Sequence, residues 1–335
     1  MSTYNRVLRW VVAILFGMSV SVAGIRTDAA DGKAEKWAVL IGIDDYAHAK
    51  KLKYAVADQQ ALNDELIKSG FDKRQVTLLR DKAESTQFLP FKSNVEKQIS
   101  LICDLAEAGD LVFIAFSGHG RHMSKKSFIC PADGKLDEAD TMIALDWVYE
   151  RLQKCKADLK LVMVDACRDV DPFLGGQRGG NEPERKEEMR AFISSSERLP
   201  DGLILLHSCS EGEKANEDEN LGHGVFTHFL LEGLRGKADE NTNGKVTLGE
   251  LMLFASRETK LYVKDKFADL QRPKMKGNYT LEAQDFELIA FRGTRPPPTL
   301  PTTPRQPQHD APASEQRRSE FSNSLGMKLV PFKAG

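Results

Sequence analysis

Short, continuous apolar runs alternate with helical patterns over the first two thirds of the chain. The runs lack polar alternation and are typical of strands covered on both faces. Predicted strands lie at Trp37–Ile43, Val76–Leu79, Asp110–Ser117, Leu159–Asp165 and Leu203–Ser208. Apolar residues at helical spacing predict helices over Leu52–Ile67, with Gly70 at the C-cap position, and over Val95–Ala106. Strands separated by helices predict an α/β fold whose mostly parallel sheet carries helices on both faces.

The N-terminal segment has the pattern of a secretory signal. Arg6 and Arg9 precede an apolar run from Trp10 to Val22, and small residues follow it. The run is shorter than the roughly 20 residues that a spanning helix needs. We therefore expect residues 1–30 to be a signal peptide that directs export to the periplasm or the extracellular space. An uncleaved N-terminal membrane anchor is the alternative.

Composition divides the rest of the chain into three parts. Residues 31–292 carry the predicted strands and helices, and a polar, glycine-containing loop is expected between Pro172 and Pro200. Seven prolines fall between Arg295 and Pro312, so residues 293–320 are expected to form an extended linker. Residues 321–335 follow as the start of a further segment.

Charge and cysteine content exclude some classes of protein. The 335 residues include 47 Lys and Arg against 49 Asp and Glu, a net charge of −2, so no nucleic-acid partner is expected. Five scattered cysteines are too few for a disulfide scaffold and form no CxxC zinc motif. Their odd number leaves at least one thiol unpaired, which is either buried and inert or chemically used.

Chemically active residue types follow two of the predicted strands. Phe116–Gly120 contains His119 between two glycines, and Asp165–Arg168 contains Cys167. Ligands of parallel α/β sheets bind where the strands end. A cysteine peptidase needs a thiol beside an imidazole and N–H groups directed at the oxyanion. The pair predicts this chemistry, whereas each residue alone would fit a buried thiol or a strand-end histidine held by the backbone.

The histidine lies 48 residues before the cysteine, close to the spacing of caspases. With these motifs the chain resembles the caspase-like cysteine peptidases (clan CD, peptidase C14 type), and among them the bacterial metacaspase-like group. Leu52–Asp58, Phe128–Asp133 and Gly222–His228 add to the resemblance. It implies a caspase-like three-layer sandwich around a mostly parallel six-stranded sheet.

The resemblance also implies roles for individual residues. Cys167 would be the nucleophile and His119 its general base, with the backbone N–H groups of Gly120 and Cys167 as the oxyanion hole. Asp58, Ser117 and Asp165 match the positions that bind a basic substrate side chain in metacaspase-like enzymes. We therefore expect protein or peptide substrates cleaved after Arg or Lys, with no cofactor required for the chemistry.

One departure affects the expected specificity. Metacaspases commonly have histidine after the nucleophile, whereas this chain has Arg168, as the caspase motif does. Asp165 could pair with Arg168, and Asp58 could have only the structural role of capping or turning the start of a helix.

Self-cleavage is a further expectation, because basic residues occur in the polar loop: Arg178, Arg185, Lys186, Arg190 and Arg198. A catalytically inactive caspase-like interaction or signalling module is the alternative function.

A calcium-loop pattern lies near the end of the predicted domain. Residues Asp239–Glu250 satisfy D-x-[DN]-x-[DN]-G-x5-E, with Gly244 at the sharp turn. The candidate ligand residues are Asp239, Asn241, Asn243, Lys245 and Glu250. Two asparagines reduce the charge of the loop, so weak calcium binding is expected. A turn between helices that binds no ion is the alternative.

The C-terminal tail has its own resemblance. Phe321–Pro331 is similar to the opening of a formylglycine-generating, sulfatase-modifying domain. The segment is too short to bury a core. The resemblance therefore assigns no activity to this chain.

Overall fold

A six-stranded sheet is the centre of the first of two units in the chain, Met1–Thr294. The computed structural model describes residues 34–166, 187, 190–192, 199–277, 286–290, 321–322 and 328–329. The strand order is β12-β8-β7-β3-β1-β2. The strands are β1 (Lys36–Gly42), β2 (Val76–Arg80), β3 (Leu111–Ser117), β7 (Leu159–Asp165), β8 (Leu203–His207) and β12 (Lys274–Gly277).

Five of these strands are parallel, and β12 pairs antiparallel with β8 at the edge. The five parallel strands are the ones that the apolar runs predict. The largely parallel sheet confirms the predicted fold class. The lysines of β12, Lys274 and Lys276, kept that strand from standing out as an apolar run.

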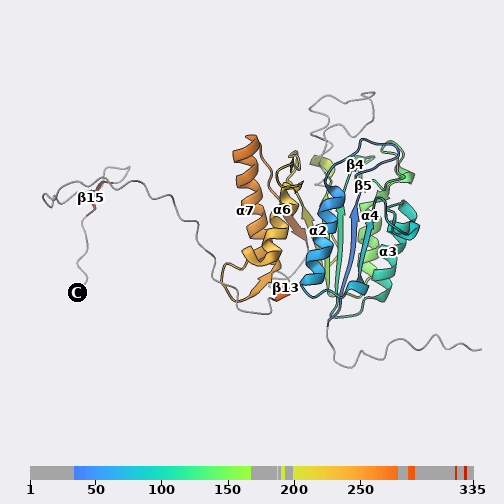
Figure 1. Ribbon diagram of the computed structural model, residues 1–335, viewed down its shortest axis with the longest axis horizontal. Coiled ribbons are helices and arrows are strands. Elements are labelled where there is room, and N and C mark those ends of the chain that lie inside the picture. The colour runs from blue at the N-terminus through green and yellow to red at the C-terminus, as the bar shows by residue number, and fades with distance from the viewer. Residues whose placement is uncertain are drawn as a thin grey trace, which may run out of the picture. The chain divides into compact units, whose positions relative to one another are not determined.

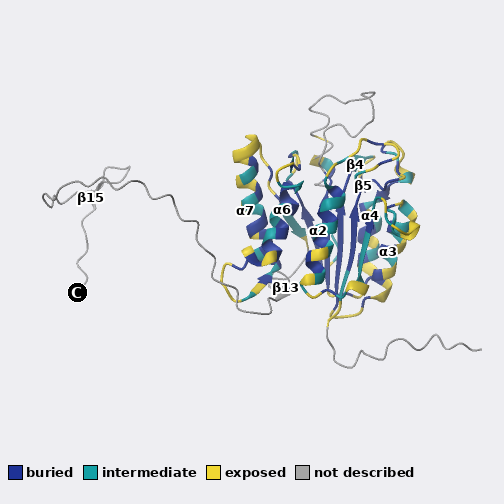
Figure 2. Cartoon of the chain, viewed as in Figure 1, coloured by how far each residue is buried: buried dark blue, intermediate teal, exposed yellow. Residues whose placement is uncertain are grey.

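Helices cover both faces of the sheet (Figures 1 and 2). The helices are α2 (Ala55–Lys68), α3 (Lys92–Leu105), α4 (Leu145–Lys154), α6 (Val225–Glu232) and α7 (Leu248–Phe267). Because side chains alternate along a strand, Val162 and Val164 of β7 pack into the core under α3 and α4. Leu161 and Met163 pack into the second core, under α2, α6 and α7. The result is the predicted three-layer arrangement.

Short strands and helical turns connect the main elements. A three-stranded sheet of β4, β5 and β6 follows β3, and two-stranded ladders join β9 to β10 and β11 to β13. Their bounds are β4 (Gly120–Met123), β5 (Lys126–Ile129), β6 (Ile143–Ala144), β9 (Glu217–Asp218), β10 (His223–Gly224), β11 (Lys245–Thr247) and β13 (Glu287–Ala290). Single turns are η1 (Lys73–Gln75), η2 (Thr86–Phe88), η3 (Ala139–Thr141) and η4 (Gly233–Lys237).

The second unit is Arg295–Gly335. Within it, β14 (Phe321–Ser322) pairs antiparallel with β15 (Lys328–Leu329). The expected signal peptide or anchor, residues 1–30, and the expected linker, residues 293–320, lie outside the described residues. Among the helices of the described part of the chain, none is long and apolar enough to cross a membrane.

Candidate active site

The carboxyl ends of β3 and β7 lie side by side, as the sequence predicts. Ser117 is in register with Asp165, so the residues that follow the two strands leave the sheet from adjacent positions. The N–H of Gly118 donates to the carbonyl of Asp165 at 3.1 Å. His119 follows directly, while Cys167 lies outside the described residues. The described chain toward Cys167 ends at Ala166.

Gly120 lies against the residue that precedes Cys167. A Cβ atom added at Gly120 would be 2.8 Å from the Cβ of Ala166 and 2.8 Å from the ring of Phe192. No side chain fits there without movement of its neighbours. The glycine after the histidine therefore permits close approach of the two strand ends.

The imidazole of His119 is fixed from two sides. Its Nε2 lies 2.6 Å from the carbonyl oxygen of Lys50, in the segment that follows β1. The ring of Tyr46 lies 4.6 Å from the imidazole, centroid to centroid, at a tilt of 45°. The N–H of His119 also donates to the Tyr46 hydroxyl at 2.8 Å. His119 is only 2% exposed, so its ring is well shielded from water.

The hydrogen bond at Nε2 determines which nitrogen carries the proton in the neutral ring. Because the Lys50 oxygen can only accept, Nε2 must donate to it. The second nitrogen, Nδ1, then carries the lone pair in the neutral imidazole and is the proton-accepting atom. The arrangement can therefore orient a histidine as a general base.

The backbone after His119 is held by the small sheet. The N–H of Cys130 donates to the carbonyl of His119 at 2.9 Å, beside the pair of Gly120 with Ile129. The carbonyl of His119 and the N–H of Gly120 belong to one trans peptide unit and so point in opposite directions. The Gly120 N–H is therefore directed away from β5, as an oxyanion donor would have to be.

The three residues expected to bind a basic side chain share one face of the sheet. Ser117 and Asp165 end β3 and β7 on the face that α2 covers, because they continue the alternation of Ala115 and Met163. Asp58 belongs to α2. Asp58 and Ser117 are 0% exposed and Asp165 is 1% exposed.

The first turns of α2 lie directly over this row. Gly42 of β1 is in register with Ser117, and a Cβ at Gly42 would be 3.0 Å from the Cα of Val56 and 3.1 Å from the Cβ of Gln59. Asp58 lies between those two residues of α2 in the sequence. Two buried carboxyl groups thus come from elements that pack together at one edge of the sheet.

Asp58 is also bound to the start of α6. Its Oδ1 lies 2.8 Å from Nδ1 of His223, and it accepts a hydrogen bond from the N–H of Gly224 at 3.2 Å. Gly224 is the N-cap residue of α6. The carboxylate therefore joins α2 to α6, a structural role at a helix start that the sequence left open as an alternative.

The expected calcium loop forms a compact turn before α7. Both carboxylate oxygens of Asp239 accept backbone N–H groups, from Asn243 at 3.1 Å and from Gly244 at 3.0 Å. The Nδ2 of Asn241 donates to Oε1 of Glu250 at 2.5 Å. Gly244 has a φ of +78°, which explains the glycine at this position. The loop thus joins Asn241 to Glu250, while Asp239 stabilises the turn through backbone N–H groups.

Glu250, Lys245 and Arg190 have other partners in the structure. Glu250 also closes a capping box with Thr247 at the start of α7. Lys245 forms an ion pair with Glu287. Within the described ranges, no group of three or more His, Cys, Asp or Glu side chains is arranged to hold a metal ion. Arg190 forms an ion pair with Glu187 at 3.3 Å.

Four of the five basic residues of the polar loop, and Arg168, lie outside the described residues.

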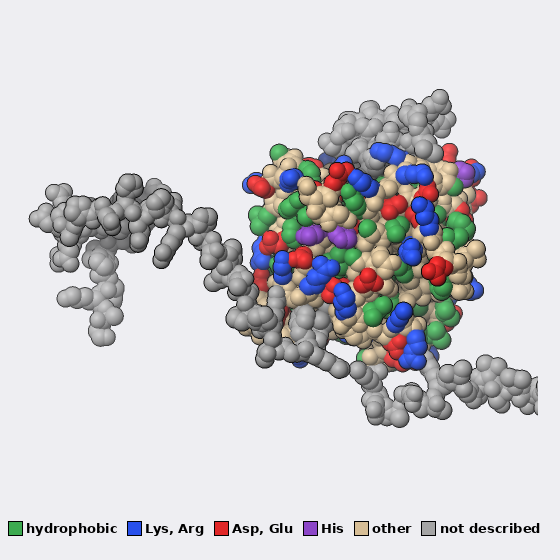
Figure 3. All heavy atoms as spheres, viewed as in Figure 1, with side chains coloured by type: hydrophobic (Ala, Val, Ile, Leu, Met, Phe, Trp, Pro, Cys, Tyr) green, Lys and Arg blue, Asp and Glu red, His purple; other side chains and the backbone are tan. Residues whose placement is uncertain are grey.

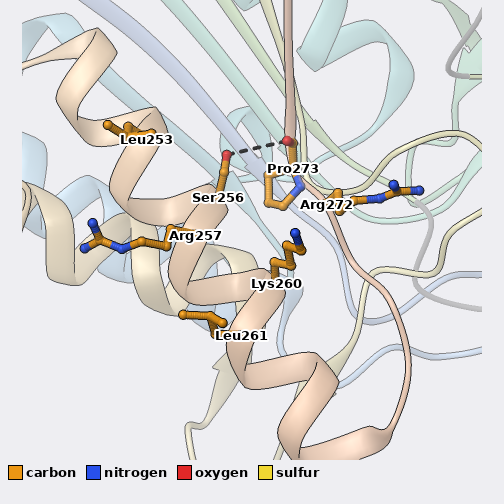
Figure 4. A pocket seen from close by; sticks show the side chains of 7 residues that line it. All are labelled: Leu253, Ser256, Arg257, Lys260, Leu261, Arg272 and Pro273. Atoms are coloured by element: carbon orange, nitrogen blue, oxygen red, sulfur yellow. Dashed lines mark hydrogen bonds between the residues drawn. The ribbon is translucent and has the colours of Figure 1, made fainter. Parts of the chain in front are cut away.

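The surface elsewhere carries mixed charge, with acidic and basic side chains interspersed on the face in Figure 3. A surface groove of about 330 Å³ lies between α7 and the segment before β12, lined by Leu253, Ser256, Arg257, Lys260, Leu261, Arg272 and Pro273 (Figure 4). None of the candidate residues lines this groove.

Sequence reasoning missed three groups that hold the site. Tyr46 and the carbonyl of Lys50 both follow β1, and His223 precedes α6. An aromatic residue shortly after a predicted parallel strand was a usable signal for Tyr46, because such residues lie at the carboxyl edge. A backbone carbonyl has no sequence signal at all.

A mostly parallel six-stranded sheet with a fixed histidine at its carboxyl edge defines a caspase-like α/β domain. A family model described as the caspase domain matches residues 35–282, and the chain belongs to this family of cysteine-peptidase type. Its structure is similar to the crystal structure of a Geobacter sulfurreducens protein, with a TM-score of 0.52, 17% identity, and coverage of 75% of this chain and 96% of that one.

A second similar structure is that of pro-sf-caspase-1. The TM-score is 0.47 at 19% identity, with coverage of 74% of this chain and 89% of the other. A search of curated protein sequences gave no significant match. At 17% identity the Geobacter sulfurreducens structure supports the fold alone. The family rests on the match over residues 35–282.

Proposed function

We propose that the chain is a cysteine endopeptidase in which Cys167 attacks the scissile carbonyl and His119 transfers the proton. The observation that carries the proposal is the orientation of the imidazole. Nε2–H donates a hydrogen bond to the Lys50 carbonyl, so Nδ1 is the basic nitrogen. Further support comes from Gly120, which packs against Ala166, the neighbour of Cys167. Membership of the caspase domain family points to the same chemistry.

The proposed reaction has two halves. Nδ1 of His119 takes the thiol proton as the sulfur of Cys167 attacks, and the carbonyl oxygen becomes an oxyanion. The N–H groups of Gly120 and Cys167 stabilise that charge. Collapse breaks the C–N bond, and the leaving amine takes the proton from His119. Water, activated by the same imidazole, then hydrolyses the thioester and restores the thiol.

We further propose that the substrate residue before the scissile bond is Arg or Lys. Asp58 and Asp165 are buried on one face of the sheet around Ser117. Asp58 already has hydrogen-bond donors in His223 and Gly224, so it is the sign of the charge that favours a basic substrate. A basic side chain that enters this region would be attracted by the two acidic residues, whereas a substrate aspartate would be repelled.

Hydrolysis of fluorogenic peptides tests both proposals. Peptides with Arg, Lys or Asp before the scissile bond are compared with wild type, Cys167→Ala and Asp165→Asn. We expect turnover of the Arg and Lys peptides, loss of about 10³-fold or more in Cys167→Ala, and a fall of about 30-fold in Asp165→Asn for the Arg peptide. Full activity in Cys167→Ala contradicts the nucleophile. Faster turnover of the Asp peptide contradicts the specificity alone.

Self-processing is part of the proposed function. Basic residues of the polar loop, among them Arg190, are candidate cleavage points for an enzyme that cuts after Arg or Lys. Wild-type chain should yield fragments that end at a basic residue between Pro172 and Pro200, and Cys167→Ala should stay intact. Equal fragmentation of the two proteins contradicts self-cleavage.

We also propose weak calcium binding by the loop Asp239–Glu250. The oxygen-rich turn at Gly244 supports it, because Asp239 accepts two backbone N–H groups there and Asn241 contacts Glu250, and calcium prefers oxygen ligands. Calorimetric titration with millimolar calcium should give heat in wild type and none in Asp239→Ala. Equal traces for both proteins contradict a calcium site here.

Export remains a proposal that rests on residues 1–30 alone. Fractionation of expressing cells should place the wild-type chain outside the cytoplasm and a chain without residues 1–30 inside it. Retention of the mature protein in a membrane fraction after salt washing would favour the anchor over the cleaved signal. Equal distribution of the two chains contradicts export.

A further inference from the structure

Two cysteines meet where α3 packs against the end of α4. Cys103 lies in the last turns of α3, and Cys155 is the C-cap residue of α4. They are 6% and 5% exposed and belong to the same hydrophobic core. Each thiol changes the pKa of the other through a side-chain hydrogen bond, so the two side chains are neighbours although 52 positions separate them in the sequence.

Two ion pairs at the surface flank the cysteines. Arg151 of α4 binds Asp104 at 3.2 Å, next to Cys103. Lys156, next to Cys155, binds Glu107 at 2.9 Å. The two pairs connect the segments on either side of the thiols. The proximity of the thiols follows from the packing of α3 against α4 and does not depend on the weak thiol hydrogen bond.

The two thiols are electrostatically unequal. The hydrogen bond from Cys103 lowers the pKa of Cys155, with a further contribution from the N–H of Ala157 and from the charge of Lys160. The same hydrogen bond, together with burial, raises the pKa of Cys103. The pair thus consists of one sulfur that favours the thiolate and one that stays protonated. Thiol–disulfide exchange requires an attacking thiolate.

Both cysteines lie close to the surface, because Cys155 is flanked by the exposed Lys154 and Lys156 and Cys103 is followed by the exposed Asp104. Cys130 is 0% exposed and lies outside the pair. Its thiol donates to the carbonyl of Pro131 at 3.5 Å, and burial raises its pKa to about 12. Cys130 is therefore the matched control for a buried cysteine outside the pair.

We propose that Cys103 and Cys155 are a redox pair that closes to a disulfide between α3 and α4 on reaction with a small-molecule disulfide such as oxidised glutathione. The Cys155 thiolate attacks one sulfur of the oxidant, and the oxidant's S–S bond breaks to release one thiolate. That thiolate takes the proton of Cys103, whose sulfur then attacks the mixed disulfide at Cys155. The second leaving group departs as a thiolate and takes up the proton that Cys155 had lost to solvent, so two protein thiols are oxidised and one disulfide is reduced to two thiols.

Closure would link the segment that carries His119 into one covalent loop. Residues 103–155 include β3, the small sheet of β4–β6 and α4. A disulfide across a loop of this length restricts the unfolded chain more than the folded one. The unfolding temperature of the oxidised protein should therefore rise by about 5 °C or more. This inference does not depend on the proposed peptidase activity.

Peptide mapping of the full chain tests the pair. The protein is incubated with oxidised or reduced glutathione, quenched with acid, alkylated in denaturant and digested. We expect a peptide that joins Cys103 to Cys155, lighter by two hydrogen atoms than its parts, only after oxidation. Alkylation of both residues after treatment with oxidised glutathione overturns the proposal, as do stable glutathione adducts on Cys155 or a bridge between other cysteines.

Thermal unfolding with matched variants gives the second readout. Oxidation should raise the unfolding temperature of wild type and of Cys130→Ser, and it should leave that of Cys155→Ser unchanged. A rise of equal size in Cys155→Ser contradicts the assignment. If Cys155→Ser does not fold, the mapping of the unsubstituted chain decides the question by itself.

Discussion

Removal of the Tyr46 hydroxyl should weaken the support of His119 by a calculable amount. Tyr46 is 5% exposed, and its hydroxyl accepts the N–H of His119 at 2.8 Å. Burial raises the pKa of Tyr46 well above its usual value, so the hydroxyl is neutral at any assay pH near 7. Tyr46→Phe keeps the ring beside the imidazole and removes only the acceptor.

A buried N–H that loses its partner costs about 1–3 kcal/mol, offset in part because the hydroxyl no longer has to be buried. We expect a net loss of about 1–2 kcal/mol in the free energy of unfolding, or about 3–6 °C in the unfolding temperature. Urea titration followed by circular dichroism measures the first quantity, and calorimetry measures the second.

Tyr149→Phe is the matched control. Tyr149 is 8% exposed, and its hydroxyl has no hydrogen-bond partner among the described residues. Loss of that hydroxyl should leave the free energy of unfolding unchanged within about 0.5 kcal/mol, or raise it. Equal destabilisation by the two substitutions, or none by Tyr46→Phe, would refute the reasoning that the Tyr46 hydroxyl holds the backbone of His119.

Three further substitutions test the neighbourhood of the site. Gly120→Ala places a Cβ 2.8 Å from that of Ala166. The free energy of unfolding should fall by about 1–3 kcal/mol, and kcat/KM on an Arg peptide should fall with it. Unchanged values of both quantities would argue against close packing of the strand ends. His223→Ala removes a donor 2.8 Å from the buried carboxylate of Asp58 and should cost about 1.5–3 kcal/mol in urea unfolding, with partial rescue by His223→Gln; no loss excludes that bond. Burial lowers the pKa of His207 from 6.5 to about 3. As the pH falls below 6.5, the unfolded chain binds a proton at His207 that the folded chain does not bind. The free energy of unfolding is therefore unaffected by His207 above pH 6.5 and falls as the pH drops toward 3. Wild type should lose about 2 kcal/mol more than His207→Leu between pH 7 and pH 5, and parallel losses would contradict a neutral buried ring.

The sequence predicted the five parallel strands because each is a buried apolar run, as in Leu159–Asp165, which the structure reproduces. It also placed the His119 and Cys167 motifs after predicted strands, and the structure shows that those strands end side by side, with Ser117 in register with Asp165. Long-range contacts were out of reach. Nothing local indicates that Asp58 meets His223 or that Cys103 meets Cys155, since both depend on how helices pack across the fold.

The candidate site was predicted only in part, because it too depends on long-range contacts. His119 could be named from its glycine neighbours and its place after a strand, whereas its orientation depends on Tyr46 and the Lys50 carbonyl. Those contacts arise because the segment after β1 runs back over the end of β3. A sequence pattern records residue types along the chain, and it does not record which carbonyl a folded segment presents.

Labelling of the nucleophile tests the central claim most directly. An arginyl chloromethyl ketone is added to wild type, His119→Ala and Cys130→Ser, and the modified cysteine is located by peptide mapping. The account predicts labelling of Cys167 in wild type and Cys130→Ser, and a rate lower by about 10²-fold or more in His119→Ala. Labelling of Cys167 at the same rate with and without His119 would contradict a shared proton between them.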